Sequence, residues 1–361
     1  MRALRIRLFM ITLLLMAIGV VMIYSSSAIY AYEVHGDSAY YLKKHLVFML
    51  IGFVLSVFFM SFDYVKLRKF AKPFLLVSMA LLVLVLIPGI GNVTGSARRW
   101  INIWFINFQP SEVAKLALIF YAADILSRKQ SDIKNFVYGF LPLIMALGAC
   151  LLLILLEPDL GTAVAIAVLI LAMAFIAGAE LKHLGAITLP AIPLLVLLIA
   201  IKPYRLKRIF AFLNPWADPK GVGYQIIQSF IALGSGGIFG VGLGHSQQKL
   251  FYLPEAHTDF IFSIIGEELG FIGAVGIIFL FIIFIYLGTH IAFKARDLYG
   301  QLLAFGLVAM IALQAIVNIA AVIGAIPTKG LPLPFISYGG SSLVYSMLSV
   351  ALLLNIARHR R

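Results

Sequence analysis

Residues 268–293 read ELGFIGAVGIIFLFIIFIYLGTHIAF, a stretch that contains no Lys or Arg and has Glu268 as its one acidic residue. A run of this length matches the ~20 apolar residues with which a helix crosses the hydrocarbon core of a bilayer. The whole chain is 62% hydrophobic and 12% charged, with a mean hydropathy of +1.04. This hydrophobic fraction is larger than the core of a soluble protein of this length requires. The sequence therefore predicts an all-α integral membrane protein with one membrane domain, residues 1–361.

Similar apolar runs recur along the sequence, and ten have a length suited to a membrane span. The fourth is short and carries Lys115 and Asp124, so it is either a span or an amphipathic element that lines a cavity. Residues 202–258 form one long loop between the seventh and eighth runs. The predicted spans are residues 8–30, 44–62, 73–89, 112–127, 137–156, 160–178, 184–201, 268–293, 301–326 and 341–357.

The loops differ in charge, and this difference predicts the orientation. Lys and Arg concentrate at both termini and in the loops that share their side, which places both termini in the cytoplasm and loop 202–258 outside. Within that loop, segment 224–239 is apolar but too short to cross, so we expect a short surface-lying or re-entrant helix. The net charge of +13 is spread over both faces without a soluble aromatic-rich module, which argues against nucleic acid as a partner.

A polar segment, residues 242–268, leads into the eighth span. Asp259 stands near the expected start of that helix, where a carboxylate can act as a general base or hold a divalent cation. The alternative is that Thr258 or Asp259 simply caps the helix. Glu267 and Glu268 are better explained as structural groups that face the interface.

Two further groups of charged residues stand out. Arg98 and Arg99 precede Trp100, a combination that suits a phosphate group together with a sugar or lipid at the membrane surface. The alternative is an interfacial anchor. Glu112 and Lys115 are three residues apart at a helix start, so we expect them to pair as a structural lock within the membrane.

Several motifs together resemble the SEDS family (FtsW/RodA/SpoVE) of bacterial cell-wall proteins. The resemblance runs in order along nearly the whole chain, and it is closest to the cell-division member, with the sporulation member nearly as close. The motifs are Arg98–Trp100, Gln109–Glu112, Glu157–Thr162, Gly242–Gly244, Gln248–Lys249, Pro254–Phe260, Gly266–Gly270 and Leu333–Ser342.

This resemblance implies a peptidoglycan glycosyltransferase that polymerises lipid II on the outer face of the bacterial cytoplasmic membrane, at the division septum. It also implies a class B penicillin-binding protein as the crosslinking partner and contacts with other membrane proteins of the division complex. By motif position, the family's catalytic aspartate corresponds to Asp259, its outer-loop motif to Arg98, Arg99 and Trp100, and its intramembrane pair to Glu112 and Lys115.

The expected chemistry needs one base and several cations. A sugar 4-hydroxyl attacks an anomeric carbon whose leaving group is a lipid diphosphate, so no general acid is required. We expect Asp259 to deprotonate or orient that hydroxyl, with bound Mg²⁺ or Mn²⁺ and no organic cofactor, and we expect inversion to a β-1,4 product. The candidate diphosphate ligands are Arg98, Arg99, Arg205, Arg208 and Lys249.

Three other interpretations stay open. Ten spans with Gly and Pro breaks and intramembrane charges also suit a transporter that flips lipid II, although no inverted repeat is evident and the polar motifs gather on one face. The chain could serve elongation or sporulation as another member of the same family. It could also be a scaffold that recruits a division partner through spans eight and nine, a role compatible with catalysis.

Overall fold

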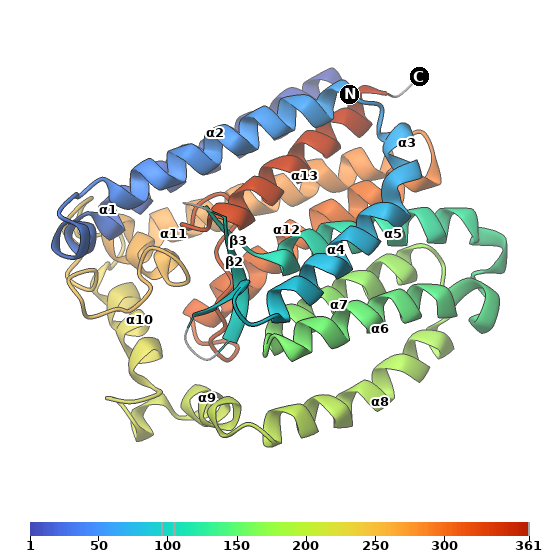
Figure 1. The fold of residues 1–361 in the computed structure, drawn as a ribbon. Coiled ribbons are helices and arrows are strands. Elements are labelled where there is room, and N and C mark those ends of the chain that lie inside the picture. Colours follow the sequence, from blue (N-terminus) through green and yellow to red (C-terminus); the bar gives the residue numbers. More distant parts are fainter. Residues whose placement is uncertain (95–96, 104–105, 360–361) are drawn as a thin grey trace.

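The computed structural model describes residues 1–94, 97–103 and 106–359, which form a bundle of long helices (Figure 1). Each predicted span is helical, and eight helical stretches of the described chain are long and apolar enough to cross a membrane. Helix α7 is shorter, and α5 carries three charged residues in its apolar part. The two termini lie at the same end of the bundle. The long helices are α1 (Arg2–His35), α2 (Tyr40–Ser61), α4 (Ala71–Leu86), α5 (Pro110–Arg128), α6 (Leu141–Leu156), α7 (Leu160–Ile176), α8 (Leu181–Ala200), α11 (Ile261–Phe293), α12 (Leu298–Val322) and α13 (Gly340–Arg358).

Helix α5, the irregular fourth run, lies at the centre of the bundle. It packs against α4, α7, α12 and α13, and nearly all of its side chains are buried. Lys115 Nζ donates hydrogen bonds to Glu112 Oε1 at 2.9 Å and to Gln314 Oε1 of α12 at 3.2 Å. Charges can occupy this position because protein surrounds them and they are paired. The fourth run is therefore a core helix of the bundle.

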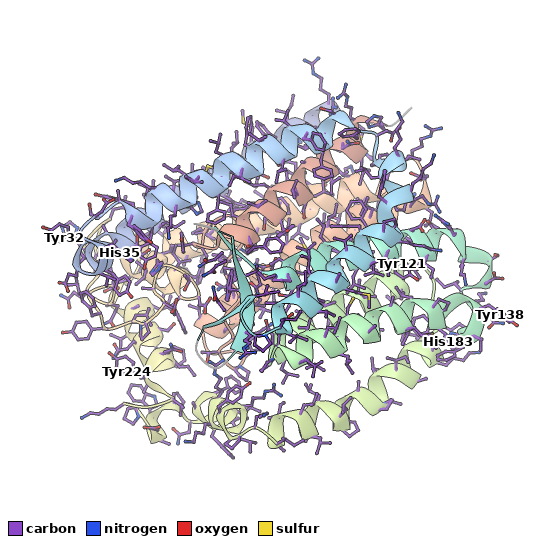
Figure 2. The ribbon with its side chains drawn as sticks, viewed as in Figure 1. Tyr32, His35, Tyr121, Tyr138, His183 and Tyr224 are labelled. Carbon is purple, nitrogen blue, oxygen red and sulfur yellow. The ribbon has the colours of Figure 1, made fainter. Side chains whose placement is uncertain are left out.

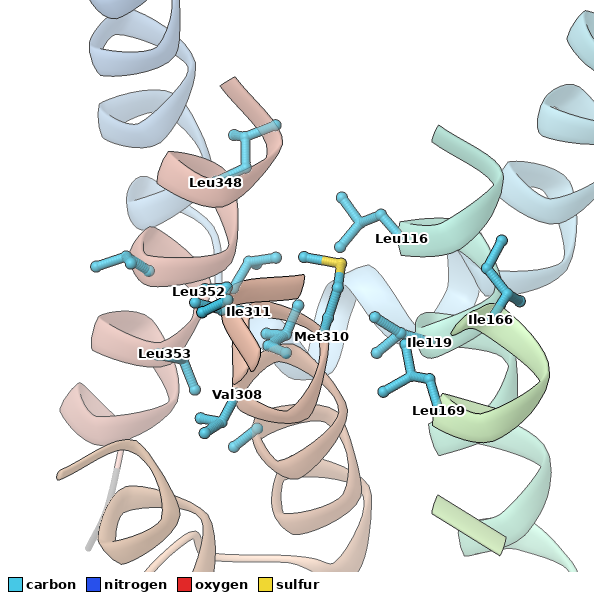
Figure 3. Packing of buried hydrophobic residues seen from close by; sticks show 14 of the residues in the cluster. Leu116, Ile119, Ile166, Leu169, Val308, Met310, Ile311, Leu348, Leu352 and Leu353 are labelled. Atoms are coloured by element: carbon cyan, nitrogen blue, oxygen red, sulfur yellow. The ribbon is translucent and has the colours of Figure 1, made fainter. Parts of the chain in front are cut away.

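Apolar side chains of α5, α7, α12 and α13 interdigitate around this centre (Figure 3). Leu116 and Ile119 of α5 face Met310 of α12 and Leu169 of α7. Gly306 of α12 allows close approach, since a Cβ atom there would lie 2.7 Å from a methyl of Ile119. Helix association inside a membrane depends on such packing, because lipid is as apolar as the side chains.

The outer segments contain structure that the sequence did not predict. A small antiparallel sheet of order β1-β2-β3 is formed by β1 (Gly91–Thr94), β2 (Ala97–Ile103) and β3 (Ile106–Phe108). Helix α9 (Pro203–Leu213) follows α8. The remaining short helical turns are α3 (Tyr64–Leu67), η1 (Arg68–Phe70), η2 (Gln130–Asp132), η3 (Phe136–Phe140) and η4 (Pro215–Ala217).

The predicted short apolar helix of the long loop is present as α10 (Tyr224–Ser235). It lies at the end of the bundle opposite the termini (Figure 1) and packs against α11. Ser229 Oγ donates to the carbonyl of Val322 at 2.7 Å and lies 2.7 Å from Ser263 Oγ. These bonds tie α10 to α11 and α12, so it does not cross the bundle.

Helix α11 is kinked at Gly270, whose φ of 69° lies in the left-handed region. A Cβ atom at Gly270 would lie 2.3 Å from the nitrogen of Gly240. The loop after α10 therefore packs directly on the kink, and the Val241 and Gly242 amides donate to the Glu267 and Glu268 carbonyls at 2.9 and 3.0 Å. This contact fixes the first segment of α11, which begins two residues after Asp259.

We expect Lys115→Met to lower the stability of the protein by about 3–5 kcal/mol, because it leaves the Glu112 carboxylate buried without its cation. The double variant Glu112→Gln, Lys115→Met removes both charges and should recover part of the loss. Thermal unfolding in detergent measures both. A double variant no more stable than Lys115→Met would contradict this account.

Candidate functional site

Asp259 lies partly buried between the outer loop and α12. Its carbonyl accepts a hydrogen bond of 2.8 Å from Asn318 Nδ2. Its carboxylate faces Gly330, where a Cβ atom would lie 2.8 Å from Oδ2. Helix α11 starts after Phe260, and no side chain caps it. The alternative role of Asp259 or Thr258 as a helix cap is therefore wrong, because the helix begins beyond both residues.

The surroundings of Asp259 raise the pKa of its carboxyl toward neutral pH. Burial raises the pKa of this carboxyl to about 7, and the nearby charge of Glu255 adds to the rise, while Arg208 and Lys329 oppose it. A pKa close to the working pH suits a general base.

A cavity of about 460 Å³ opens beside Asp259 and includes its neighbour Gly330. One part of the wall is cationic, and another part is apolar and comes from α7 and α8. The charged residues on the wall are Arg99, Arg205, Arg208, Lys329 and Asp159, and the apolar part includes Val164, Val168, Leu195 and Ile199. The cavity thus joins positive charge to a surface suited to lipid.

Arg99 is held at this wall by the turn between α6 and α7. It donates from Nη2 to the carbonyl of Pro158 at 2.6 Å and from Nε to that of Glu157 at 3.3 Å. The Glu157 carboxyl is fully buried, and burial with the nearby Asp159 raises its pKa to about 8. Glu157 is therefore largely protonated at neutral pH, and the carboxylate that faces Arg99 is that of Asp159, whose Oδ2 lies 3.9 Å from Arg99 Nε.

Lys329 also lines the cavity, although the sequence did not indicate it as a candidate ligand. Its Nζ is buried without a hydrogen-bond partner among the described residues. Burial lowers its pKa to about 8, and Asp159 partly offsets this. Gly161 makes room for it, since a Cβ atom there would lie 1.9 Å from Lys329 Cε. The only sequence signal was a single Lys in an outer loop, which does not reveal an inward-pointing side chain.

The structure divides the other predicted ligands into two groups. Arg205 and Arg208, on α9, line the cavity, and Arg205 Nη1 also donates to the carbonyl of Leu198 at 2.6 Å. Arg98 and Trp100 flank Arg99 on β2 at a β-bulge, where Asn92 pairs with Trp100 and Val93 pairs with Arg98. Neither lines the cavity.

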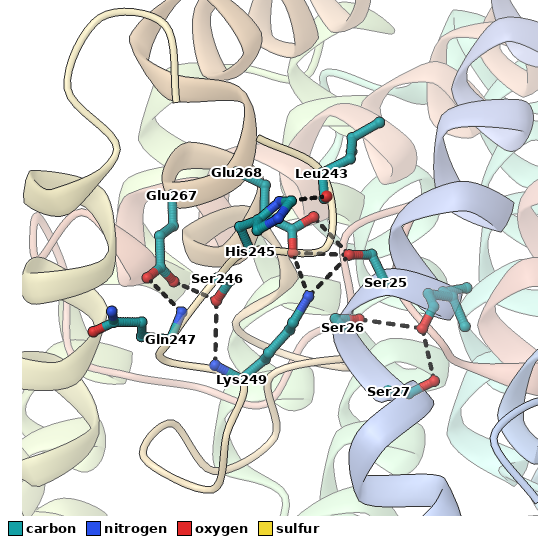
Figure 4. Close-up of polar contacts among 11 residues, drawn as sticks. Ser25, Ser26, Ser27, Leu243, His245, Ser246, Gln247, Lys249, Glu267 and Glu268 are labelled. Carbon is teal, nitrogen blue, oxygen red and sulfur yellow. Dashed lines mark hydrogen bonds and ion pairs between the residues drawn. The ribbon is translucent and has the colours of Figure 1, made fainter. Parts of the chain in front are cut away.

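Lys249 is not at the cavity. Its Nζ pairs with Glu268 Oε1 at 2.7 Å, and Ser25 of α1 donates to the same carboxylate (Figure 4). Both charged side chains are almost fully buried. The prediction of Lys249 as a diphosphate ligand is therefore corrected, because its charge is neutralised inside the protein. The same view shows Glu267 accepting from Ser246 and from the Gln247 amide, which are structural contacts.

Comparison with known proteins agrees with this architecture. A family profile described as "Cell cycle protein" (FtsW/RodA/SpoVE) matches residues 5–361. The chain belongs to this family. The FtsW/RodA/SpoVE match thus includes Asp259, the cavity and the bundle.

Individual relatives are similar over almost their full length. A probable peptidoglycan glycosyltransferase FtsW of Trichlorobacter lovleyi is 49% identical over 97% of this chain and 92% of its own. Stage V sporulation protein E of Bacillus subtilis is 46% identical over 98% and 97%.

Two solved structures share the fold. A peptidoglycan synthase complex that coordinates polymerization and crosslinking contains a chain with a TM-score of 0.79 and 28% identity, covering 98% of this chain and 97% of that one. The rod shape determining protein RodA of Thermus thermophilus has a TM-score of 0.73 and 27% identity, with 98% and 96% covered.

The two buried lysines should respond oppositely to substitution. Lys249→Met leaves Glu268 buried without a cation and should lower the thermal midpoint. Lys329→Met removes a buried ammonium whose lowered pKa shows that folding disfavours its charge, so the midpoint should stay or rise. Thermal unfolding at neutral pH compares them, and equal losses for both would contradict the assignment of Lys329 to the site.

Proposed function

We propose that this chain polymerises lipid II into β-1,4-linked glycan strands, with Asp259 as the catalytic base. As a member of the FtsW/RodA/SpoVE family, it is a peptidoglycan glycosyltransferase. One observation carries the assignment of the site. A carboxyl with a pKa of about 7 lies beside a cavity whose wall combines four cationic side chains with an apolar surface.

The reaction is a single displacement. The 4-hydroxyl oxygen of the acceptor sugar forms a bond to the anomeric carbon of the donor, and the bond from that carbon to the diphosphate oxygen breaks. The hydroxyl proton passes to the Asp259 carboxylate, and the lipid diphosphate leaves as an anion. Attack from the face opposite the leaving group converts the α-linked donor to a β-linked product.

The cavity supplies what this leaving group requires. Arg99, Arg205 and Arg208 present guanidinium groups that match phosphate oxygens, and Lys329 adds a cation close to Asp259. Positive charge that is already in place stabilises the anion as it develops. The apolar wall from α7 and α8 is suited to the attached lipid chain.

A divalent cation fits this site only with substrate oxygens. No group of three His, Cys, Asp or Glu side chains that could hold a metal occurs in the part of the chain that the structure describes. Mg²⁺ is commonly held by one or two carboxylates together with substrate phosphates. We propose Asp259 as the protein ligand for Mg²⁺ or Mn²⁺, which when bound would neutralise diphosphate charge.

We further propose a crosslinking partner and a location. The similar synthase complex couples polymerization to crosslinking, which supports a class B penicillin-binding protein as partner. The termini share one end of the bundle, and the Lys and Arg pattern supports a cytoplasmic location for both. Similarity to FtsW proteins supports a septal role, and similarity to the sporulation protein supports a related role during sporulation.

Polymerisation of purified lipid II tests the proposal. Asp259→Asn keeps the shape of the side chain but removes the base, so we expect the rate of strand synthesis to fall by about 10²–10⁴-fold. Asp218→Asn, an exposed aspartate of the same outer loop, serves as the matched control and should keep the rate. Wild-type rates for folded Asp259→Asn, or headgroup translocation without polymer by the wild type, would refute the proposal.

The pH dependence gives a second test. Asp259 must be ionised to accept a proton, so the rate should rise with pH through about 7. It should fall again above about 8 as Lys329 loses its charge. Because Glu255 raises the pKa of Asp259, Glu255→Gln should move the acid limb to lower pH and leave the alkaline limb in place. An acid limb that does not move in this variant would contradict the role of Asp259 as base.

A further inference from the structure

Aromatic rings gather around His257, two residues before Asp259. The His257 ring centroid lies 4.4 Å from that of Tyr41 and 5.9 Å from that of Tyr30. Tyr338 packs edge-on to Tyr41 at 5.2 Å, and Phe251 lies 5.8 Å from Tyr30. We call these five residues the aromatic platform. They come from α1, α2, the loop before α11 and the loop before α13, so only the tertiary structure brings them together.

The platform is connected to the catalytic carboxylate by backbone. The Cα atoms of residues two apart lie within about 7 Å of each other, so the backbone of His257, which carries one ring of the platform, lies close to the backbone of Asp259. The carbonyl of His257 accepts a hydrogen bond of 2.9 Å from the amide of Tyr338, which ties the two platform loops together. None of the five rings lines the cationic cavity. The chain around Asp259 therefore borders two different groups of side chains.

The chemistry of the platform differs from that of the cavity. Tyr30 is 37% exposed and Phe251 is 51% exposed, while the other rings are partly buried. Tyrosine and histidine rings present an apolar face and a polar edge. A sugar ring has the complementary form, with an apolar face of C–H groups and hydroxyls at its rim.

We propose that the aromatic platform is a sugar-binding subsite that holds the glycan strand while Asp259 joins the next unit. This proposal rests on the proposed function. The cavity takes the charged diphosphate, and the platform takes the neutral sugar rings that extend from the reacting bond. A strand that stays on the platform after each addition remains close to the base for the next one.

The main alternative is that these rings belong to the interfacial belt of aromatic residues that anchors membrane proteins. Tyr32 separates the two explanations. It lies on α1 close to the platform, is 65% exposed, and has no ring contact among the described residues (Figure 2). If the rings anchor the protein in the membrane, the exposed Tyr32 should matter as much as Tyr30. If the rings bind sugar, only the residues that contact one another in the platform should matter.

The length of the glycan strands measures how well the platform holds the strand between additions. In Tyr30→Ala and Phe251→Ala we expect the mean strand length made from lipid II to fall by about threefold or more, and by more than the rate of the first coupling falls. Tyr32→Ala is the matched control and should keep the wild-type length. Tyr30→Phe keeps the ring and should restore the length lost in Tyr30→Ala. Equal shortening by Tyr32→Ala would show an anchor and overturn the proposal.

A binding measurement separates this proposal from the catalytic one. The probe is an uncharged, lipid-free hexasaccharide of β-1,4-linked N-acetylglucosamine, titrated into the full chain in detergent by calorimetry. We expect binding by the wild type and by Asp259→Asn, and weaker binding by Phe251→Ala. Equal affinity of the wild type and Phe251→Ala, or absence of binding, would overturn the platform even if polymerisation proceeds. Binding without polymer by the wild type would instead refute only the proposed catalysis.

Discussion

The structure depends on one constraint, which is that a charge inside an apolar bundle must be paired. Glu112 and Lys115 satisfy it at the centre of the bundle, where Gln314 adds a third contact. Lys249 and Glu268 satisfy it near the kink of α11, with Ser25 of α1 completing the group. Gln314 links the first pair to α12, and Ser25 links the second pair to α1. Removing one partner of either pair would leave a charge in a medium that cannot solvate it. These pairs hold the helices that carry the site.

The exceptions to this constraint mark the site. Lys329 and Asp259 are both largely withdrawn from water without a paired partner of opposite charge among the described residues, and their pKa values shift toward neutrality, to about 8 and about 7. Such groups lower the stability of the folded state, so they persist where a ligand or a reaction uses them. Gly161 and Gly330 support this arrangement, because a side chain at either position would displace Lys329 or Asp259.

The surroundings of Asp259 also separate two kinds of recognition. Cations and apolar side chains lie on the cavity, where α7, α8 and α9 meet the loop before α13. Aromatic rings lie around His257, where α1 ends and α2 begins. A polymerase of a lipid-linked sugar must bind a charged diphosphate and neutral sugar rings at the same reacting bond. The chain around Asp259 borders both kinds of side chain, as the proposed reaction requires.

The sequence by itself determined the membrane fold, the helical form of the ten apolar runs, the short apolar helix of the outer loop and the choice of Asp259 as the candidate base. These follow from local features, namely the length of apolar runs and the order of motifs. Only the tertiary structure decided which cations lie at the candidate site. It turned Lys249 inward to Glu268, and it placed Lys329 and Arg99, but not Arg98, on the wall of the cavity. Long-range packing sets the partner of a buried charge, and spacing along the chain does not encode it.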